Sequence, residues 1–291
     1  MTKTLFVSDL DGTLLDSNAK ITLNTAEIIN KLIDSGLIFT YATARSFVTA
    51  SRVASGINFK YPALHHNGVF IQDPKTGEYL DKCIFDREKA AQLLNIMRDN
   101  RLYPLVYASI DGRERVSWIA EDTENNRKER CETPGIKFYL DSRKGDPRLR
   151  PVQDYSDFIG DMFELYEIVF IGESHEELEP IVRVVDLCPH FEYNIIIDSY
   201  KYDGKTKYWL EITRFDATKG EGVKKLQKIV GADRVVCFGD NFNDIPMFNV
   251  SDESYAVENA LPEVRELATD VIGSNDADGV ARWLLNNITA V

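Results

Sequence analysis

Short apolar runs alternate with amphipathic stretches near both ends of the chain. Residues 5–7, 37–42 and 234–238 are rich in strand-favouring apolar and aromatic residues, and such nearly continuous runs are typical of strands buried on both faces. Between the first two runs, residues 22–35 carry apolar side chains at helical spacing and end before Gly36, a common helix terminator. A strand, a helix and a second strand in succession predict a βαβ unit with parallel strands.

The same alternation returns toward the C-terminus, where residues 218–230 carry an apolar stripe at helical spacing before the third run. The middle of the chain differs, because a helical pattern around residues 90–97 leads into irregular strands and polar stretches. We therefore expect an α/β fold. It combines a Rossmann-like parallel-sheet core domain, formed by residues 1–82 and 211–291, with an α+β domain inserted at residues 83–210.

Polar residues follow each buried run, at the edge where open α/β sheets bind their ligands. Two carboxylates as close in sequence as Asp9 and Asp11 repel one another and raise each other's pKa unless a cation lies between them. This pair favours a magnesium ion and a phosphoryl group, with one aspartate as nucleophile and the other transferring protons. The polar residues at the three strand ends are Asp9, Asp11, Thr43, Asp240, Asn243 and Asp244.

Structural alternatives exist for these residues. An Asp-x-Asp-Gly sequence is also a common surface turn. For Thr43 taken alone, a plain N-cap of the helix predicted at residues 46–54 is the favoured interpretation. Lys219 lies in the first turn of the helix at residues 218–230, where a cation opposes the helix dipole at a cost of a few tenths of a kcal/mol. An anion that Lys219 must contact explains this position better, so we expect its removal to damage catalysis more than stability.

Composition limits the classes of partner. The chain has 291 residues, 44% of them hydrophobic, and a formal net charge of −13. This acidity disfavours nucleic acid and anionic membranes as partners, and no apolar run approaches the roughly 18 residues of a membrane span. The four cysteines are scattered without CxxC spacing, which favours reduced thiols in the cytoplasm. A cytoplasmic protein that binds a phosphate ester then needs positive charge close to its site.

Together the strand-end and helix-start residues resemble the haloacid dehalogenase superfamily of phosphohydrolases, in its Cof-type branch, over nearly the whole chain. Four segments carry the resemblance: Asp9-Leu10-Asp11-Gly12-Thr13, Thr43-Ala44-Arg45, Thr218-Lys219-Gly220 and Gly239-Asp240-Asn241-Phe242-Asn243-Asp244. The turn Asn67-Gly68 also matches this branch. Ala44 departs from the family, which commonly has glycine there, but the backbone amide is retained.

The resemblance implies a magnesium-dependent phosphatase. Asp9 would attack phosphorus to give an aspartyl-phosphate, and Asp11 would protonate the leaving alcohol and then deprotonate water. Magnesium would be held by Asp9, the Asp11 backbone carbonyl and Asp240, with Asp244 in support, through water or by orienting Lys219.

The resemblance also implies how the phosphoryl oxygens are bound. Thr43, Lys219 and Asn243, with the backbone amides of Leu10 and Ala44, would hold these oxygens and offset their charge. The inserted domain would act as a cap that excludes water and selects the leaving group. The substrate is expected to be a small phosphorylated metabolite, such as a sugar phosphate, and the protein a monomer or weak homodimer.

Two alternatives to a phosphatase stay open. A phosphomutase of the same fold uses the same two aspartates, and a non-catalytic protein that binds a phosphorylated metabolite would keep the fold without turnover. A dehalogenase is disfavoured, because displacement of halide from carbon needs no leaving-group acid such as Asp11. In the inserted domain, Arg143, Lys144, Arg148 and Arg150 form a basic segment. Such a segment is usually a solvated loop, and recognition of an anionic substrate is the less favoured interpretation.

Overall fold

The computed structural model describes residues 2–120, 131, 133–159, 163–199 and 206–288. The chain divides into two compact units. The first, the core unit, consists of Met1–Cys83 and Asp216–Val291, and the second, the inserted unit, is Ile84–Phe215. Within the described ranges, no helix is both long and apolar enough to cross a membrane.

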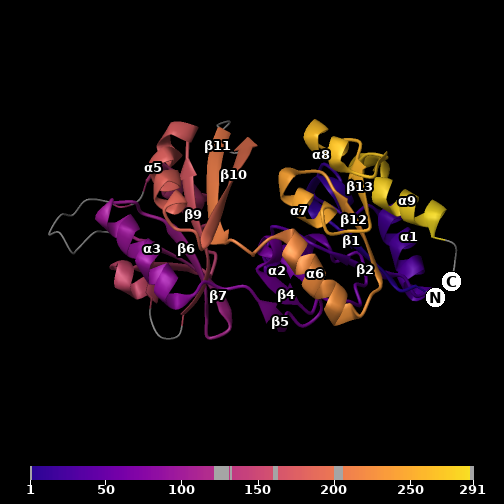
Figure 1. Cartoon of the computed structure of the whole chain (residues 1–291), viewed down its shortest axis with the longest axis horizontal. Helices are drawn as coiled ribbons and strands as arrows, with labels where there is room; N and C mark the ends of the chain where they lie inside the picture. Colours follow the sequence, from indigo (N-terminus) through magenta and orange to yellow (C-terminus); the bar gives the residue numbers. More distant parts are fainter. Residues whose placement is uncertain (1, 121–130, 132, 160–162, 200–205, 289–291) are drawn as a thin grey trace. The chain divides into compact units, whose positions relative to one another are not determined.

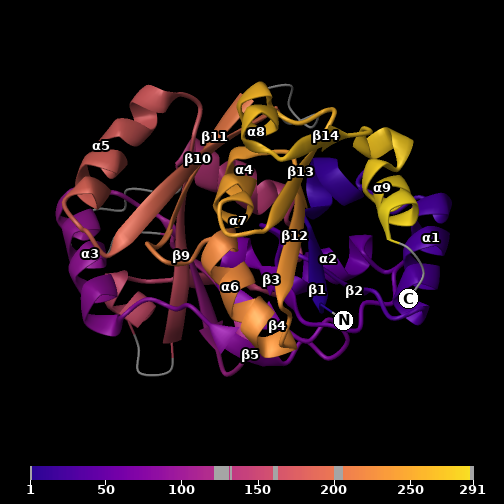
Figure 2. The same cartoon turned by 45° about the vertical axis from the view of Figure 1, so that its right-hand side comes forward.

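The core unit contains a five-stranded parallel sheet in the order β14-β13-β12-β1-β2. Both views place α6 and α7 on one face of this sheet and α1 and α9 on the other (Figures 1 and 2). The elements of this unit that carry the sheet and its helices are β1 (Thr4–Ser8), α1 (Leu23–Asp34), β2 (Ile38–Tyr41), α2 (Phe47–Val53), α6 (Lys219–Val230), β12 (Arg234–Gly239), α7 (Ile245–Phe248), β13 (Glu253–Val257), α8 (Pro262–Leu267), β14 (Asp270–Ile272) and α9 (Gly279–Asn287).

The apolar run at the start of the chain forms β1, which lies between β12 and β2. Leu5 and Val7 are fully buried, because helices cover both faces of the sheet, and this explains why the run does not alternate between apolar and polar residues. The parallel sheet predicted from these runs is confirmed.

A short antiparallel sheet follows β2, made of β3 (Ala63–His65), β4 (Phe70–Gln72) and β5 (Tyr79–Lys82). The turn His66–Gly68 joins β3 to β4 and packs against the start of α6. Gly68 has φ +103°, and a Cβ there would lie 2.2 Å from the carbonyl oxygen of Thr218. Glycine is therefore required for this turn to approach the helix that carries Lys219.

The inserted unit contains a six-stranded sheet in the order β10-β11-β9-β6-β7-β8, antiparallel except for the pair β7–β8. One face packs on α3 and α5 through a core that includes Leu94 and Ile181. The other face packs on α4 through Trp118, Tyr139 and Trp209. The elements are α3 (Arg87–Asp99), β6 (Leu105–Ile110), β7 (Arg113–Ile119), α4 (Pro134–Ser142), β8 (Leu149–Val152), β9 (Phe163–Gly172), α5 (His175–Asp186), β10 (Phe191–Ser199) and β11 (Thr206–Arg214).

Candidate active site

Asp9 lies directly after β1, the strand between β12 and β2 in the core sheet. Its peptide N–H donates to the carbonyl oxygen of Phe238 at 2.9 Å, so the backbone keeps its pairing with β12 one residue beyond the strand. The Asp9 side chain is buried, and such a carboxylate is costly unless a cation compensates it. This residue is not part of a solvent-exposed turn, and the surface-turn alternative for Asp9 is wrong.

Lys219 supplies that positive charge. It is the first residue of α6 and is almost fully buried. Its Nζ donates to Oδ1 of Asp9 and to Oδ1 of Asp244, each at 2.6 Å. Two charge-assisted hydrogen bonds outweigh the few tenths of a kcal/mol that the helix dipole costs. Lys219 therefore stabilises two buried carboxylates, and the expectation that its removal spares stability must be revised.

Asp244 is fully buried, and both of its oxygens accept hydrogen bonds. Oδ1 accepts from Lys219, and Oδ2 accepts from the peptide N–H groups of Asp240 and Asn241 at 2.8 and 3.0 Å. Asp244 thus fixes the turn after β12 and orients Lys219 at the same time. This geometry supports the orienting role for Asp244 over a role as direct metal ligand.

Asp240 is held beside Asp9 and Asp244, and one carboxylate oxygen from each of the three lies within 4.8 Å of the others. Oδ1 of Asp240 accepts a hydrogen bond from the Thr13 hydroxyl at 2.9 Å. Gly12, with φ +78°, lies so close that a Cβ there would be 2.5 Å from Oδ2 of Asp240. The Asp240 carboxylate therefore connects the turn after β12 to the loop after Asp11, and no sequence pattern predicted the contact with Thr13.

The pKa values of the cluster show how crowded these carboxylates are. Burial is the main cause that raises the pKa of Asp9, with Lys219 acting against it. Burial and the neighbouring Asp244 raise the pKa of Asp240 from its usual 3.8 to about 6. Burial by itself lowers the pKa of Lys219, but the Asp244 and Asp9 carboxylates outweigh it and raise that pKa. One lysine does not balance three carboxylates, so the site favours an additional cation.

Asp11 differs from Asp9 in its exposure and its partner. Its side chain is about half exposed, at 49%. The Arg45 guanidinium donates to both of its oxygens, with Nε 2.6 Å from Oδ2. This bidentate geometry raises the pKa of Arg45 chiefly through the hydrogen bond to Asp11. Arg45 was part of a recognised motif, but nothing in the sequence assigned it this partner.

Thr43 and Asn243 lie at the ends of β2 and β12. The Thr43 hydroxyl accepts from the peptide N–H of Arg45 at 3.1 Å. Ser46 caps α2 by accepting from Thr49, so the N-cap alternative for Thr43 is wrong. Nδ2 of Asn243 donates to Oδ1 of Asn67 at 3.0 Å, which ties the turn after β3 to the turn after β12.

The two residues expected to offer backbone amides occupy the same strand ends. Leu10 follows Asp9 and is fully buried, whereas Ala44 follows Thr43 and is exposed. The carboxyl ends of β1, β2 and β12 therefore bring together the residues that the sequence placed there separately.

Two arginines of the basic segment, Arg143 and Arg148, make contacts within the inserted unit. Arg148 forms ion pairs with Asp146 at 2.7 Å and Glu114 at 3.3 Å. The Arg143 guanidinium lies 4.0 Å from the ring centroid of Tyr139. Both arginines therefore contribute to packing around α4 and β8, and the solvated-loop interpretation does not describe them.

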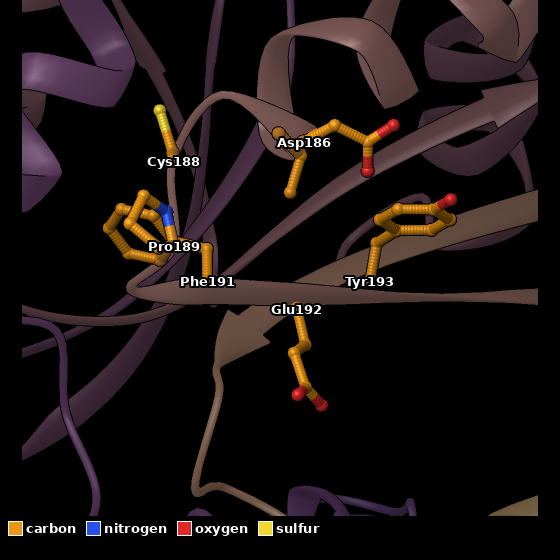
Figure 3. Close-up of a pocket in the computed structure, with 7 residues that line it drawn as sticks. Asp186, Cys188, Pro189, Phe191, Glu192 and Tyr193 are labelled. Atoms are coloured by element: carbon orange, nitrogen blue, oxygen red, sulfur yellow. The ribbon is translucent and has the colours of Figure 1, made fainter.

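A cavity of about 280 Å³ lies between the end of α5 and the start of β10 (Figure 3). In Figure 3 the side chains of Asp186 and Tyr193 project to the same side, whereas Glu192 projects away from them. The residues that line the cavity all belong to the inserted unit: Val185, Asp186, Cys188, Pro189, Phe191, Glu192 and Tyr193. None of them is a motif residue, so we assign this cavity no part in the site.

The sequence of the chain is similar to those of known proteins. Residues 6–284 match the family model of the haloacid dehalogenase-like hydrolases. The phosphatase YwtE of Bacillus subtilis, named for 5-amino-6-(5-phospho-D-ribitylamino)uracil, is 25% identical over 95% of this chain and 95% of its own length. The pyridoxal phosphate phosphatase YbhA of Escherichia coli is 23% identical over 99% of this chain and 100% of its own.

Solved structures agree on the fold. The crystal structure of TM0651 from Thermotoga maritima is 23% identical, with a TM-score of 0.73, and the match covers 100% of this chain and 99% of that one. The likeness extends over both units, since the aligned region leaves out almost nothing. The chain therefore belongs to the haloacid dehalogenase-like hydrolases and is a hydrolase of the phosphatase kind.

Proposed function

We propose that this chain hydrolyses small phosphate monoesters in a magnesium-dependent reaction through an aspartyl-phosphate at Asp9. The observation that carries the proposal is the buried Lys219, placed 2.6 Å from both Asp9 and Asp244 with Asp240 alongside. A purely structural ion pair needs one carboxylate for each lysine. The surplus of carboxylates at the carboxyl ends of β1 and β12 suits a site that also binds a cation.

The residues present fit magnesium. Asp9, Asp240 and the Asp11 backbone carbonyl would hold the ion, with Asp244 acting through Lys219. All of these donors are oxygens, which suits a hard divalent cation, and the raised pKa values of Asp9 and Asp240 indicate negative charge that such an ion offsets. When bound, magnesium would neutralise charge on the phosphoryl oxygens and bring them close to the carboxylates.

Asp9 is proposed as the nucleophile. Its Oδ1 is fixed by Lys219, so Oδ2 is the oxygen left to attack phosphorus. The new bond from Oδ2 to phosphorus forms as the bond to the leaving alcohol breaks, and water then cleaves the aspartyl-phosphate to free phosphate and the Asp9 carboxylate. Thr43 and Asn243, with the amides of Leu10 and Ala44, would bind the phosphoryl oxygens.

Asp11 is proposed to transfer protons. It would protonate the leaving oxygen in the first step and accept a proton from water in the second. Its half-exposed side chain can reach a substrate, which the fully buried Asp244, with both oxygens engaged inside the protein, cannot. Because Arg45 holds both oxygens of Asp11, this ion pair must open or shift when Asp11 carries the proton.

The substrate is proposed to be a small phosphorylated metabolite, selected by residues of the inserted unit. YwtE and YbhA are named for two chemically different phosphate monoesters, which supports the class but not one compound. We further propose that the protein acts in the cytoplasm as a monomer or weak homodimer.

The test is a screen for phosphate release over a panel of metabolite phosphomonoesters, with magnesium or with EDTA. We expect release from at least one compound with magnesium, none with EDTA, and none from Asp9→Asn under either condition. A wild-type protein that releases phosphate equally well in EDTA would refute the metal requirement. Isomerisation of an ester without free phosphate would favour the phosphomutase, and binding without either reaction would favour the non-catalytic alternative.

A further inference from the structure

Two asparagines outside the four motifs are hydrogen-bonded to the loop that follows the catalytic aspartates. Asn259 comes two residues after β13, at the same edge of the sheet as Asp9. Its Nδ2 donates to the carbonyl oxygen of Gly12 at 2.7 Å, and its Oδ1 accepts from the peptide N–H of Asn275 at 2.9 Å. One side chain therefore connects the loop after β1 to the loop after β14.

Asn275 continues this connection. It is buried, and its Nδ2 donates to the carbonyl oxygen of Leu15 at 2.9 Å. The segment from Gly12 to Leu15 is thus held at its first and last residue by two side chains that come from the opposite end of the chain. Both acceptors are backbone carbonyls, so the bonds fix the path of the segment and not the identity of its side chains.

The held segment determines how Asp11 and Asp240 are placed. Gly12 follows Asp11 directly and adopts φ +78° in close contact with Asp240. Thr13, the next residue, donates to Oδ1 of Asp240. A shift of the Gly12 carbonyl therefore displaces Asp11, the residue before it. The same shift displaces Thr13, the residue after it, and so weakens the hydrogen bond from Thr13 to Asp240.

We propose that Asn259 and Asn275 are positioning residues for the catalytic loop, a role that rests on the function proposed above. They contact neither substrate nor metal. They hold the Asp11 peptide and the Thr13 hydroxyl where Asp240 and the attacking Asp9 require them. Partners of this indirect kind typically change metal affinity or activity by roughly 10- to 100-fold when removed.

Asn30 provides a matched control within the same unit. It lies in α1, where its Nδ2 donates to the carbonyl oxygen of Gly56 at 3.0 Å and its Oδ1 accepts from the peptide N–H of Asn58 at 2.8 Å. It bridges two backbone groups in the same way as Asn259. Its partners lie in the loop after α2, outside the four motifs, so the loss of its bonds reports on stability alone.

The experiment compares Asn259→Ala, Asn275→Ala and Asn30→Ala with the wild type. We measure kcat and KM on a substrate from the screen, the affinity for Mg²⁺ alone by isothermal titration calorimetry, and the melting temperature. We expect kcat to fall by about tenfold or more for the first two variants and Mg²⁺ affinity to weaken by a similar factor. Asn30→Ala should keep both values while losing a comparable amount of melting temperature.

A more conservative variant, Asn259→Asp, allows the same measurements if the alanine proteins do not fold. Asn259→Asp keeps the shape and the acceptor for Asn275 but loses the donor to Gly12. Its added negative charge would by itself strengthen Mg²⁺ binding, so weaker binding identifies the lost hydrogen bond. Asn30→Asp is its control.

The outcomes separate the two proposals. Variants at Asn259 and Asn275 that keep wild-type kcat and Mg²⁺ affinity, with only a lower melting temperature, would assign them to structure and overturn the inference. A wild-type protein that neither binds Mg²⁺ nor releases phosphate would instead overturn the proposed function, and the inference with it.

Discussion

Replacing Asp240 by asparagine should stabilise the metal-free protein. The side chain keeps its shape, and its Oδ1 can still accept the Thr13 hydroxyl, but one of the three crowded carboxylate charges is removed. Burial and Asp244 raise the pKa of Asp240 from 3.8 to about 6. The folded state therefore binds this proton more tightly than the unfolded chain does, and the free energy of unfolding falls as pH rises through that interval.

The size of the effect follows from the shift. About two pH units correspond to about 3 kcal/mol above pH 7, where the group is ionised in both states. At pH 4.5, where the folded group is still protonated, only about 1 kcal/mol of this cost remains. Asp240→Asn should therefore be more stable than the wild type by about 3 kcal/mol at pH 7.5, or roughly 6–12 °C in melting temperature, and the advantage should shrink by about 2 kcal/mol at pH 4.5.

The assay is thermal unfolding in EDTA at both pH values, with the difference between variant and wild type as the measured quantity. Taking the difference cancels the titration of the carboxylates that do not interact with Asp240. Adding magnesium at pH 7.5 should raise the melting temperature of the wild type and close most of the gap to the variant, whose site has lost a ligand. We expect a pH-dependent gain in stability. An Asp240→Asn protein that is no more stable than the wild type, or whose gain in stability does not depend on pH, would refute the conclusion that burial and neighbouring carboxylates raise the pKa of Asp240.

Three further predictions concern single side chains. Asp9→Asn should not lower the melting temperature, because the raised pKa of Asp9 means that the folded state favours a neutral side chain there. It should lose more than about a hundredfold in kcat, close to 3 kcal/mol, and a smaller loss in steady-state turnover would exclude Asp9 as the nucleophile. Lys219→Met should lower the free energy of unfolding by about 3–5 kcal/mol in EDTA, because it leaves Asp9 and Asp244 unpaired and buried. A melting temperature that held would show that these carboxylates are protonated instead. Arg148→Ala should destabilise the protein by about 1–3 kcal/mol through its lost ion pairs. The ratio of kcat/KM between an anionic ester and an aryl phosphate should stay unchanged, and a changed ratio would indicate that Arg148 takes part in substrate recognition.

The sequence alone was sufficient for the core sheet and for the edge at which the site lies. Apolar runs without alternation identified β1, β2 and β12 as strands buried on both faces, and the βαβ rule predicted that β1 and β2 are parallel. Polar residues after such strands meet at one edge, so Asp9, Thr43 and Asp240 could be placed together without coordinates. An unfavourable lysine at a helix start also indicated an anionic partner. The sequence was enough for these conclusions because hydrophobic periodicity and the βαβ rule depend on residues that are close together in the chain.

The pairing of individual atoms was decided only by the tertiary structure. Lys219 was expected to meet an anion, but its role in stabilising Asp9, 210 residues away, appears only when α6 packs beside β1. The same holds for Arg45 with Asp11 and for Asn259 with Gly12, whose 247-residue separation leaves no periodic signal. Of the two acidic partners of Arg148, Asp146 lies two residues away in the sequence, whereas Glu114 lies 34 residues away on a neighbouring strand and was found only from the structure. A charge-assisted hydrogen bond depends on tenths of an ångström, and that precision arises from how packed elements bring distant segments together.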